Sequence, residues 1–300
     1  MFTRRQMAAL LVPLVVPARA VWAADHTVTD CRGRTVTTGP ARRIVCIGGT
    51  ITETLYGLGA ADRIVAVDIT SNWPREALQD KKSVGYMRAL SSEGVLAMNP
   101  DLILVMNDAG PPAALEQLMA SRVPLVFVDA THSPDAILAR TRFLADLVGK
   151  QAAGEQMCAQ IRQNLETLAA WRSTHTASRS VLFIMRMTGG RAMAAGTGTA
   201  ADAVIRLAGG TNAGAGMQGY KIVDRESLVA LSPDLILTMQ QDAGTVRAAL
   251  LADADFRLTP AGRTGAIVAM EGERLLGFGP RTPEAALELA HQIAGLDTPR

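Results

Sequence analysis

A tyrosine and an arginine stand two residues apart in a stretch that a glycine opens: Gly85, Tyr86 and Arg88. A phenolate is a hard oxygen donor suited to ferric iron, but a free tyrosine has a pKa of about 10. Arg88 could hydrogen-bond the phenolate oxygen and supply the positive charge that stabilises the anion. The pair is therefore a candidate iron ligand. A loop tyrosine that makes only local contacts is the alternative.

The other two tyrosines lie in different surroundings. Tyr56 falls within a helical apolar pattern, which favours packing in a core. Tyr220 precedes Glu226 by six residues. Tyr86 precedes Glu93 by seven residues. We therefore expect Tyr220 near the mirror position of Tyr86, across a cleft. There it would cover the far face of a ligand, act as a second donor, or make only local loop contacts.

Glu93 and Glu226 mark a duplication inside the chain. Residues 93–106 and 226–239 match at 8 of 14 positions with a constant offset of 133. Each copy reads as a short helix that ends at a proline and leads into Asp-Leu-Ile-Leu, an apolar run typical of a parallel strand covered on both faces. Each glutamate opens its helix, where its charge meets the helix dipole favourably without any partner. A repeat this long indicates two similar domains rather than a solenoid.

Strands and helices alternate in both halves of the chain, as they do in βα units. The strands are expected at residues 43–47, 63–68, 102–106 and 124–129, and then at 181–185, 235–239 and 266–270. The helices that carry the alternation are expected at residues 113–120, 200–207 and 283–294, with another ending at residue 58. The pattern predicts an α/β fold with two Rossmann-like lobes, each built on a parallel central sheet.

A long helix is expected between the two halves. Residues 154–173 hold no proline and place four apolar side chains on one face at helical spacing, at positions 157, 161, 165 and 168. An ordinary surface helix is the alternative to a rigid connector, but the position between the two copies favours a connector. The expected organisation is an N-terminal lobe over 41–150, a linking helix over 151–174 and a C-terminal lobe over 178–300.

The first 24 residues have the pattern of a secretory signal peptide. A basic start with Arg4 and Arg5 precedes an apolar run and a small-residue end. The run is too short to span a bilayer, so we expect an exported chain whose mature part has no membrane span. The whole chain carries a formal net charge of +2, and the first 24 residues hold three arginines and no acid. The rest is nearly neutral, and no basic stripe predicts nucleic-acid binding.

The cysteines and the short motifs of the sequence give little indication of a catalytic site. Cys31, Cys46 and Cys158 allow at most one disulfide, and burial as small apolar residues is the better interpretation of Cys46 and Cys158. Residues 48–50, Gly-Gly-Thr after a strand, resemble a nucleotide-binding turn, which leaves an exported α/β enzyme as an alternative. That turn is not Gly-x-Gly-x-x-Gly, and residues 196–199, Gly-Thr-Gly-Thr, lack the Gly-Lys-Ser/Thr ending of a P-loop. The sequence has no Gly-x-Ser-x-Gly or His-Glu-x-x-His motif.

Two segments carry a resemblance to a known family. Residues 85–94, Gly-Tyr-Met-Arg-Ala-Leu-Ser-Ser-Glu-Gly, and residues 277–281, Gly-Phe-Gly-Pro-Arg, resemble the periplasmic haem-binding proteins of bacterial haem ABC importers. That group belongs to the metal-chelate class of substrate-binding proteins, in which one long helix joins two α/β lobes. The cargo of the class is haem, cobalamin or an iron siderophore.

The resemblance implies a periplasmic, monomeric binding protein, and not an enzyme, that captures ferric haem and delivers it to an ABC permease. It implies that Tyr86 is the axial ligand of the haem iron with Arg88 as its partner, while the duplication alone places Tyr220 at the haem. It also implies that Glu93 and Glu226 dock on the transmembrane subunits of the permease, one glutamate from each lobe. A siderophore or cobalamin remains the alternative cargo, although neither needs a tyrosine beside an arginine.

Overall fold

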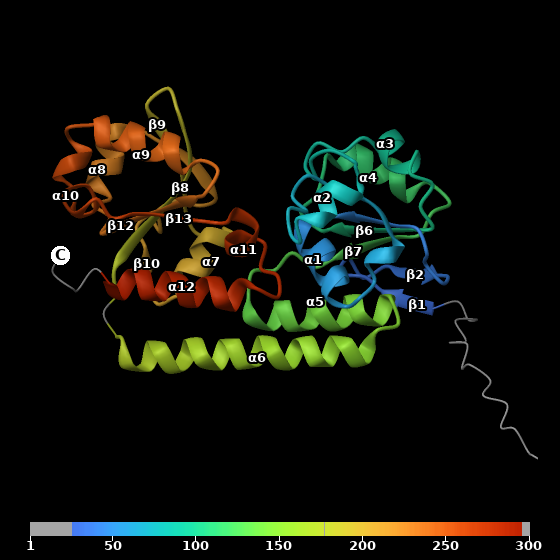
Figure 1. The fold of residues 1–300 in the computed structure, drawn as a ribbon. Helices are drawn as coiled ribbons and strands as arrows, with labels where there is room; N and C mark the ends of the chain where they lie inside the picture. The colour runs from blue at the N-terminus through green and yellow to red at the C-terminus, as the bar shows by residue number, and fades with distance from the viewer. Residues whose placement is uncertain (1–25, 177, 296–300) are drawn as a thin grey trace, which may run out of the picture.

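The computed structural model describes residues 26–176 and 178–295. Figure 1 shows two α/β lobes side by side, with the long helix α6 running beneath both of them. The signal peptide expected over residues 1–24 lies outside the described residues. Among the described residues, no helix is both long and apolar enough to cross a membrane.

The sheet of the N-terminal lobe consists of five parallel strands in the order β5-β4-β3-β6-β7. Strands β3, β6 and β7 are buried at every residue, as expected for apolar runs with helices on both faces. The strands are β3 (Ile44–Ile47), β4 (Ile64–Val67), β5 (Lys82–Ser83), β6 (Leu102–Met106) and β7 (Leu125–Val128). The helices are α1 (Gly49–Gly57), α2 (Glu76–Asp80), α3 (Ser92–Leu96), α4 (Pro112–Met119) and α5 (Pro134–Leu147). An antiparallel hairpin, β1 (His26–Thr29) and β2 (Thr35–Thr38), precedes the lobe.

The sheet of the C-terminal lobe has the order β11-β9-β8-β12-β13, with β10 also paired to β8. Its strands are β8 (Ser180–Thr188), β9 (Arg191–Ala195), β10 (Thr211–Asn212), β11 (Tyr220–Val223), β12 (Leu235–Met239) and β13 (Ile267–Met270). Its helices are α7 (Ala200–Leu207), α8 (Arg225–Ala230), α9 (Ala243–Ala252), α10 (Pro260–Thr264), α11 (Gly272–Leu276) and α12 (Thr282–Ala294). Together the two lobes confirm the predicted α/β class.

One edge of the C-terminal sheet differs from the all-parallel sheet that was expected. Strands β9 and β11 run antiparallel to their neighbours, whereas β8, β10, β12 and β13 are parallel. The reason is the turn at Gly189 and Gly190, whose φ values of 56° and 76° allow a two-residue hairpin between β8 and β9. This antiparallel edge carries Tyr220 at the start of β11.

The two lobes are joined by α6 (Gln151–Thr174), a helix of 24 residues that packs against α5 and α12. Ile161 and Leu168 are buried, and Met157 and Leu165 pack against the hydrophobic cores from the same predicted face. At Gly154 a Cβ atom would lie 2.4 Å from the Cβ of Ala145 in α5, so the close approach of the two helices requires a glycine.

The duplicated segments adopt the same local structure in both lobes. Short helices α3 and α8 each precede a proline, and the residues before these prolines, Asn99 and Ser232, have φ values of 48° and 43°. The aspartates after these prolines each accept a hydrogen bond from a backbone amide at the start of a neighbouring strand. Asp101 accepts from the Arg43 amide at 2.8 Å, and Asp234 accepts from the Ser180 amide at 2.9 Å. The repeat seen in the sequence is therefore a repeat of structure.

All three cysteines are free thiols in the structure. Cys46 and Cys158 are fully buried, which confirms their interpretation as small apolar residues, whereas Cys31 is exposed. The single disulfide that the sequence allows is not formed among these described residues.

Candidate functional site

A cleft of about 390 Å³ lies between the lobes. On the N-terminal side it is lined by residues that follow the carboxyl ends of the parallel strands, the edge at which ligands of α/β sheets bind. Gly48 follows β3, Ile69 follows β4, Tyr86 follows β5, Asp108 follows β6 and His132 follows β7. Each βα connection of this lobe therefore contributes to one wall of the cleft.

Tyr86 is held at the cleft by its neighbours in the chain. Met87 and Leu90 are anchored in the core of the N-terminal lobe, with 8% and 6% of their surfaces exposed, so Tyr86 and Arg88 remain at the surface. Gly85, with a φ of 85°, makes the turn into this segment, and its carbonyl accepts a hydrogen bond of 2.9 Å from the Ile69 amide. The Tyr86 side chain is 41% exposed, which leaves its phenol accessible to a ligand.

Arg88 makes an ion pair of 2.7 Å with Asp108. Partial burial disfavours the charged guanidinium, but the hydrogen bond and charge of Asp108, with contributions from Tyr86 and Tyr220, raise the pKa of Arg88. Among the described residues that line the cleft, Arg88 is the one lysine or arginine. The charge interactions that raise its pKa include both cleft tyrosines, Tyr86 and Tyr220.

Tyr220 belongs to the opposite wall, at the start of β11 in the C-terminal lobe. Its ring packs edge-on against Phe183 with the centroids 6.5 Å apart. Burial raises the pKa of Tyr220, although the charge of Arg88 and a hydrogen bond with Thr199 act in the opposite direction. The structure therefore brings Tyr86, Arg88 and Tyr220 to one cleft, with the two tyrosines on different lobes.

Comparison with known proteins identifies the family to which this two-lobed fold belongs. The periplasmic binding protein family matches residues 44–273. The chain belongs to this family. The periplasmic haem-binding protein RhuT from Roseiflexus sp. RS-1, in its apo form, is 34% identical with a TM-score of 0.81, and the match covers 86% of this chain and 100% of RhuT. The periplasmic haem-binding protein BhuT in complex with two haems is 35% identical with a TM-score of 0.80, covering 85% of this chain and 98% of BhuT.

Other relatives of this periplasmic binding protein differ in their named ligand. A periplasmic haem-binding protein from Pseudomonas aeruginosa is 31% identical with a TM-score of 0.78, covering 86% of this chain and 95% of that protein. A vitamin B12-binding protein from Yersinia pestis (strain Pestoides F) is 27% identical over 263 residues, 86% of this chain and 89% of that protein. The resemblance drawn from residues 85–94 and 277–281 is confirmed, and these relatives are binding proteins rather than enzymes.

Two polar residues that line the cleft of this periplasmic binding protein were not predicted as site residues from the sequence. Asp108 pairs with Arg88, and His132 packs against Phe278 with the ring centroids 5.1 Å apart. Burial lowers the pKa of His132, with Asp108 acting in the opposite direction, which favours a neutral imidazole. Both could have been predicted as cleft residues because each follows an apolar strand closely in the sequence, as the other cleft residues of this lobe do.

Methionines supply much of the apolar surface of the cleft. Two come from each lobe: Met87, Met106, Met185 and Met239. Met185 and Met239 line the wall that the C-terminal lobe contributes. Thioether side chains adapt to irregular surfaces and pack well against a flat aromatic ring.

Glu93 and Glu226 lie away from the cleft, in the first turns of α3 and α8. Both side chains are exposed. The helices are capped by Ser91, which accepts from the Gly94 amide at 3.2 Å, and by Asp224, which accepts from the Ser227 amide at 2.8 Å. Figure 1 places α3 and α8 at the top of their lobes, on the side opposite α6.

Proposed function

We propose that this periplasmic binding protein captures ferric haem in the cleft between its lobes and delivers it to an ABC permease. The observation that carries the proposal is the convergence of Tyr86, Arg88 and Tyr220 on one methionine-lined cleft. Haem is a flat apolar ring with an iron that needs an axial donor, and tyrosine is one of its established protein ligands. The cleft offers both features in one place.

Tyr86 is the proposed axial ligand. The phenol is exposed to the cleft, and a phenolate oxygen suits hard ferric iron. Arg88 stabilises the phenolate by its charge while Asp108 holds the guanidinium from the other side, at 2.7 Å. Tyr220 faces the other side of the ligand from the C-terminal lobe, and the methionines contact the ring.

Delivery requires a surface that the bound ligand does not occupy. Glu93 and Glu226 are proposed to dock on the transmembrane subunits of the permease, one carboxylate from each lobe. Both are exposed, and they occupy corresponding positions in the two copies of the duplicated segment. Figure 1 supports this role, since α3 and α8 lie on the same side of the two lobes. We also propose that residues 1–24 are a signal peptide and that the mature protein acts as a monomer in the periplasm.

Cobalamin is the second candidate ligand, because curated relatives of this chain are named vitamin B12-binding proteins. It is the weaker candidate because a cobalamin site needs no phenolate beside an arginine. The three haem-binding relatives described above are also more similar to this chain, at 31–35% identity against 27%.

Absorbance titrations of the mature protein distinguish the candidates. With hemin, wild type and Tyr56→Phe should both give a high-spin ferric tyrosinate spectrum, because Tyr56 packs in the N-terminal lobe outside the cleft. Tyr86→Phe should lose this spectrum and much of the affinity. An unchanged hemin spectrum and affinity in Tyr86→Phe, or tighter binding of cyanocobalamin than of hemin by wild type, would refute the proposal.

A further inference from the structure

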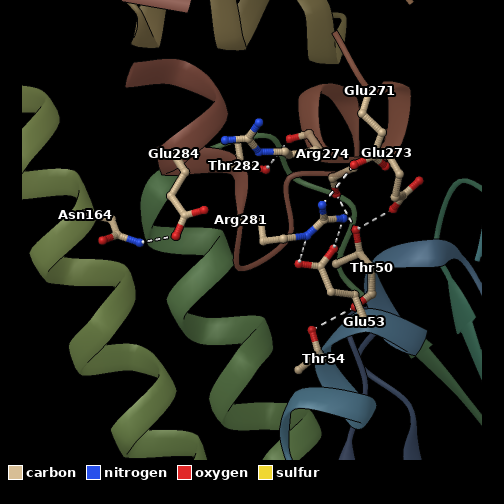
Figure 2. Close-up of polar contacts among 11 residues, drawn as sticks. Thr50, Glu53, Thr54, Asn164, Glu271, Glu273, Arg274, Arg281, Thr282 and Glu284 are labelled. Atoms are coloured by element: carbon tan, nitrogen blue, oxygen red, sulfur yellow. Dashed lines mark hydrogen bonds and ion pairs between the residues drawn. The ribbon is translucent and has the colours of Figure 1, made fainter. Parts of the chain in front are cut away.

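The segment 277–281 connects the two lobes through Arg281. Its Nε and Nη2 atoms donate to the two carboxylate oxygens of Glu53 in α1, at 3.0 and 3.2 Å. Its Nη1 atom donates to Glu271, just before α11, at 2.9 Å. Figure 2 shows the guanidinium between these two carboxylates, one from each lobe. The Arg281 side chain is 17% exposed and that of Glu53 is 7% exposed, so this bidentate pair is shielded from water.

Further hydrogen bonds from the N-terminal lobe hold the same segment. Thr50 donates its hydroxyl proton to the carbonyl of Gly277 at 2.5 Å, and Arg140 of α5 donates to the carbonyl of Phe278 at 2.6 Å. The Arg281 guanidinium also stacks over the ring of Trp73, 4.2 Å from its centroid. Side chains of the N-terminal lobe thus contact three of the five residues of this segment.

Gly277 lies too close to Glu273 for any larger residue. A Cβ atom at Gly277 would lie 2.4 Å from Oε1 of Glu273 and 2.6 Å from its backbone oxygen. Phe278 is buried and has a φ of 50°, in the left-handed region. These contacts of Gly277 lie within its own lobe. Gly279 is the glycine that approaches the other lobe, because a Cβ atom there would lie 3.3 Å from Oε2 of Glu53 and 3.5 Å from the hydroxyl of Thr50.

We propose that Arg281 is a positioning residue that acts as a latch between the lobes. It holds them at the separation at which both cleft walls can contact one ligand. Arg281 touches no ligand in this proposal; it acts through α1 and α11, which carry Thr50 and Glu273 on either side of the cleft. The effect on ligand affinity rests on the proposed function. The effect on lobe separation does not, because it is a property of the protein alone.

Glu273 makes the latch sensitive to pH. Its Oε1 atom lies 3.3 Å from the hydroxyl of Thr50, whose single proton is also donated to Gly277. Thr50 therefore shares its hydroxyl proton between Gly277 and Glu273, with the shorter contact to Gly277, and its hydrogen bond only partly offsets the effects that raise the pKa of Glu273. Burial, with the charges of nearby carboxylates, raises the pKa of Glu273 to about 8, so the carboxyl is neutral at neutral pH. The charged groups around it are Glu53, Asp68, Glu271, Arg140 and Arg281.

Above its pKa, Glu273 adds a negative charge beside Glu53 and Glu271, which already share Arg281. Like charges repel more strongly in a poorly solvated site than in water. The lobes should therefore loosen in alkaline solution. Glu273→Gln keeps the shape and the proton donor but cannot ionise, so it should remove this transition.

The test measures lobe separation without ligand. Spin labels at Glu116→Cys in α4 and Ala248→Cys in α9, both exposed, report the distance between the lobes in a Cys31→Ser background. Arg281→Met should widen and broaden the distance distribution, and Arg281→Lys should give a smaller effect because it keeps the charge. Arg274→Met is the matched control, since Arg274 pairs with Glu288 inside the C-terminal lobe.

Hemin affinity should fall about tenfold in Arg281→Met if the latched state drops to a tenth of the population. A distance distribution that is unchanged in Arg281→Met, or one that responds equally to Arg274→Met, would overturn the latch whether or not hemin binds. Should Arg281→Met fail to fold, Arg281→Lys and Glu53→Gln provide the same test. A widened distribution with unchanged hemin affinity would overturn the role in gripping the ligand.

Discussion

Arg88 Nη2 lies 2.7 Å from Asp108 Oδ2, between the connections that follow the carboxyl ends of β5 and β6. The guanidinium that acts on both cleft tyrosines thus shares its charge with a carboxylate in the ligand-free structure. Asp108 holds Arg88 in place, and it also reduces the positive charge available to a phenolate. These two effects have opposite consequences for ligand binding, and different substitutions separate them.

Asp108→Asn should keep the orientation of Arg88 but release its charge. The phenolate of Tyr86 is then more strongly stabilised, so the ferric tyrosinate spectrum should persist to lower pH than in wild type. Asp108→Ala loses the orientation as well and should bind hemin more weakly. An acid titration of the hemin complexes measures both, and a titration of Asp108→Asn that coincides with wild type would contradict the role of the charge.

Arg88→Ala should weaken hemin binding by about tenfold, the lower end of what outer-sphere partners contribute to metal affinity. The loss should be smaller than in Tyr86→Phe, because Arg88 tunes the ligand and does not supply it. Competition with apomyoglobin measures the two affinities. A larger loss in Arg88→Ala than in Tyr86→Phe would mean that haem is held mainly through its propionates.

Tyr220 should remain a neutral phenol when haem binds. Burial raises its pKa, which disfavours the phenolate of Tyr220 at neutral pH, whereas Tyr86 is 41% exposed at the cleft. Tyr220→Phe should therefore keep the tyrosinate spectrum and reduce the affinity less than Tyr86→Phe. Resonance Raman spectra of the two variants identify which phenolate binds the iron, and loss of the tyrosinate bands in Tyr220→Phe would reverse the assignment.

Much of the fold could be predicted because its strands are short apolar runs between clear breaks. The predicted bounds of β6, α7 and β12 coincide with those observed. Helix α5 was missed because Arg140 and Thr141 interrupt its apolar face, although both are buried. Arg140 is accommodated there by donating hydrogen bonds to the carbonyls of Asp129 and Phe278, which are partners that sequence spacing does not reveal.

The cleft was predictable only in part. Tyr86 and Tyr220 could be placed on opposite walls because the duplication relates their positions in the two lobes. The contact between Glu53 and Arg281 joins residues 228 positions apart, and no local pattern predicts it. Such long-range pairs depend on how the lobes pack, which periodicity and motifs within each lobe do not determine.

Glu273→Gln should flatten the pH dependence of stability. Burial, with the charges of Glu53 and Asp68, raises the pKa of Glu273 from 4.5 to about 8. Between these values the native state keeps a proton that the unfolded chain releases, so this group makes the free energy of unfolding fall as pH rises. Urea unfolding across that range measures the slope, with Glu166→Gln on the exposed face of α6 as control. A slope equal to wild type in Glu273→Gln would show that the carboxyl is ionised at neutral pH.

Charge reversal at Glu93 and Glu226 separates ligand binding from delivery. Both carboxylates are exposed and lie outside the cleft, so Glu93→Arg and Glu226→Arg should bind hemin as wild type does. Haem uptake through the permease should fall, and fall further in the double variant, because each lobe would meet one transmembrane subunit. An exposed ion pair contributes about 0.2–1 kcal/mol, so neutralisation to glutamine should be mild while reversal adds repulsion.

Glu166→Arg, on α6 at the opposite side of the molecule, is the matched control for these reversals and should leave uptake unchanged. If the two glutamates served only the dipoles of α3 and α8, reversal would slightly lower stability but leave transport by each folded molecule intact. Normal haem delivery by the folded double variant would therefore rule out docking through these residues. Reduced delivery with unchanged hemin affinity would locate the permease contact on the surface formed by α3 and α8.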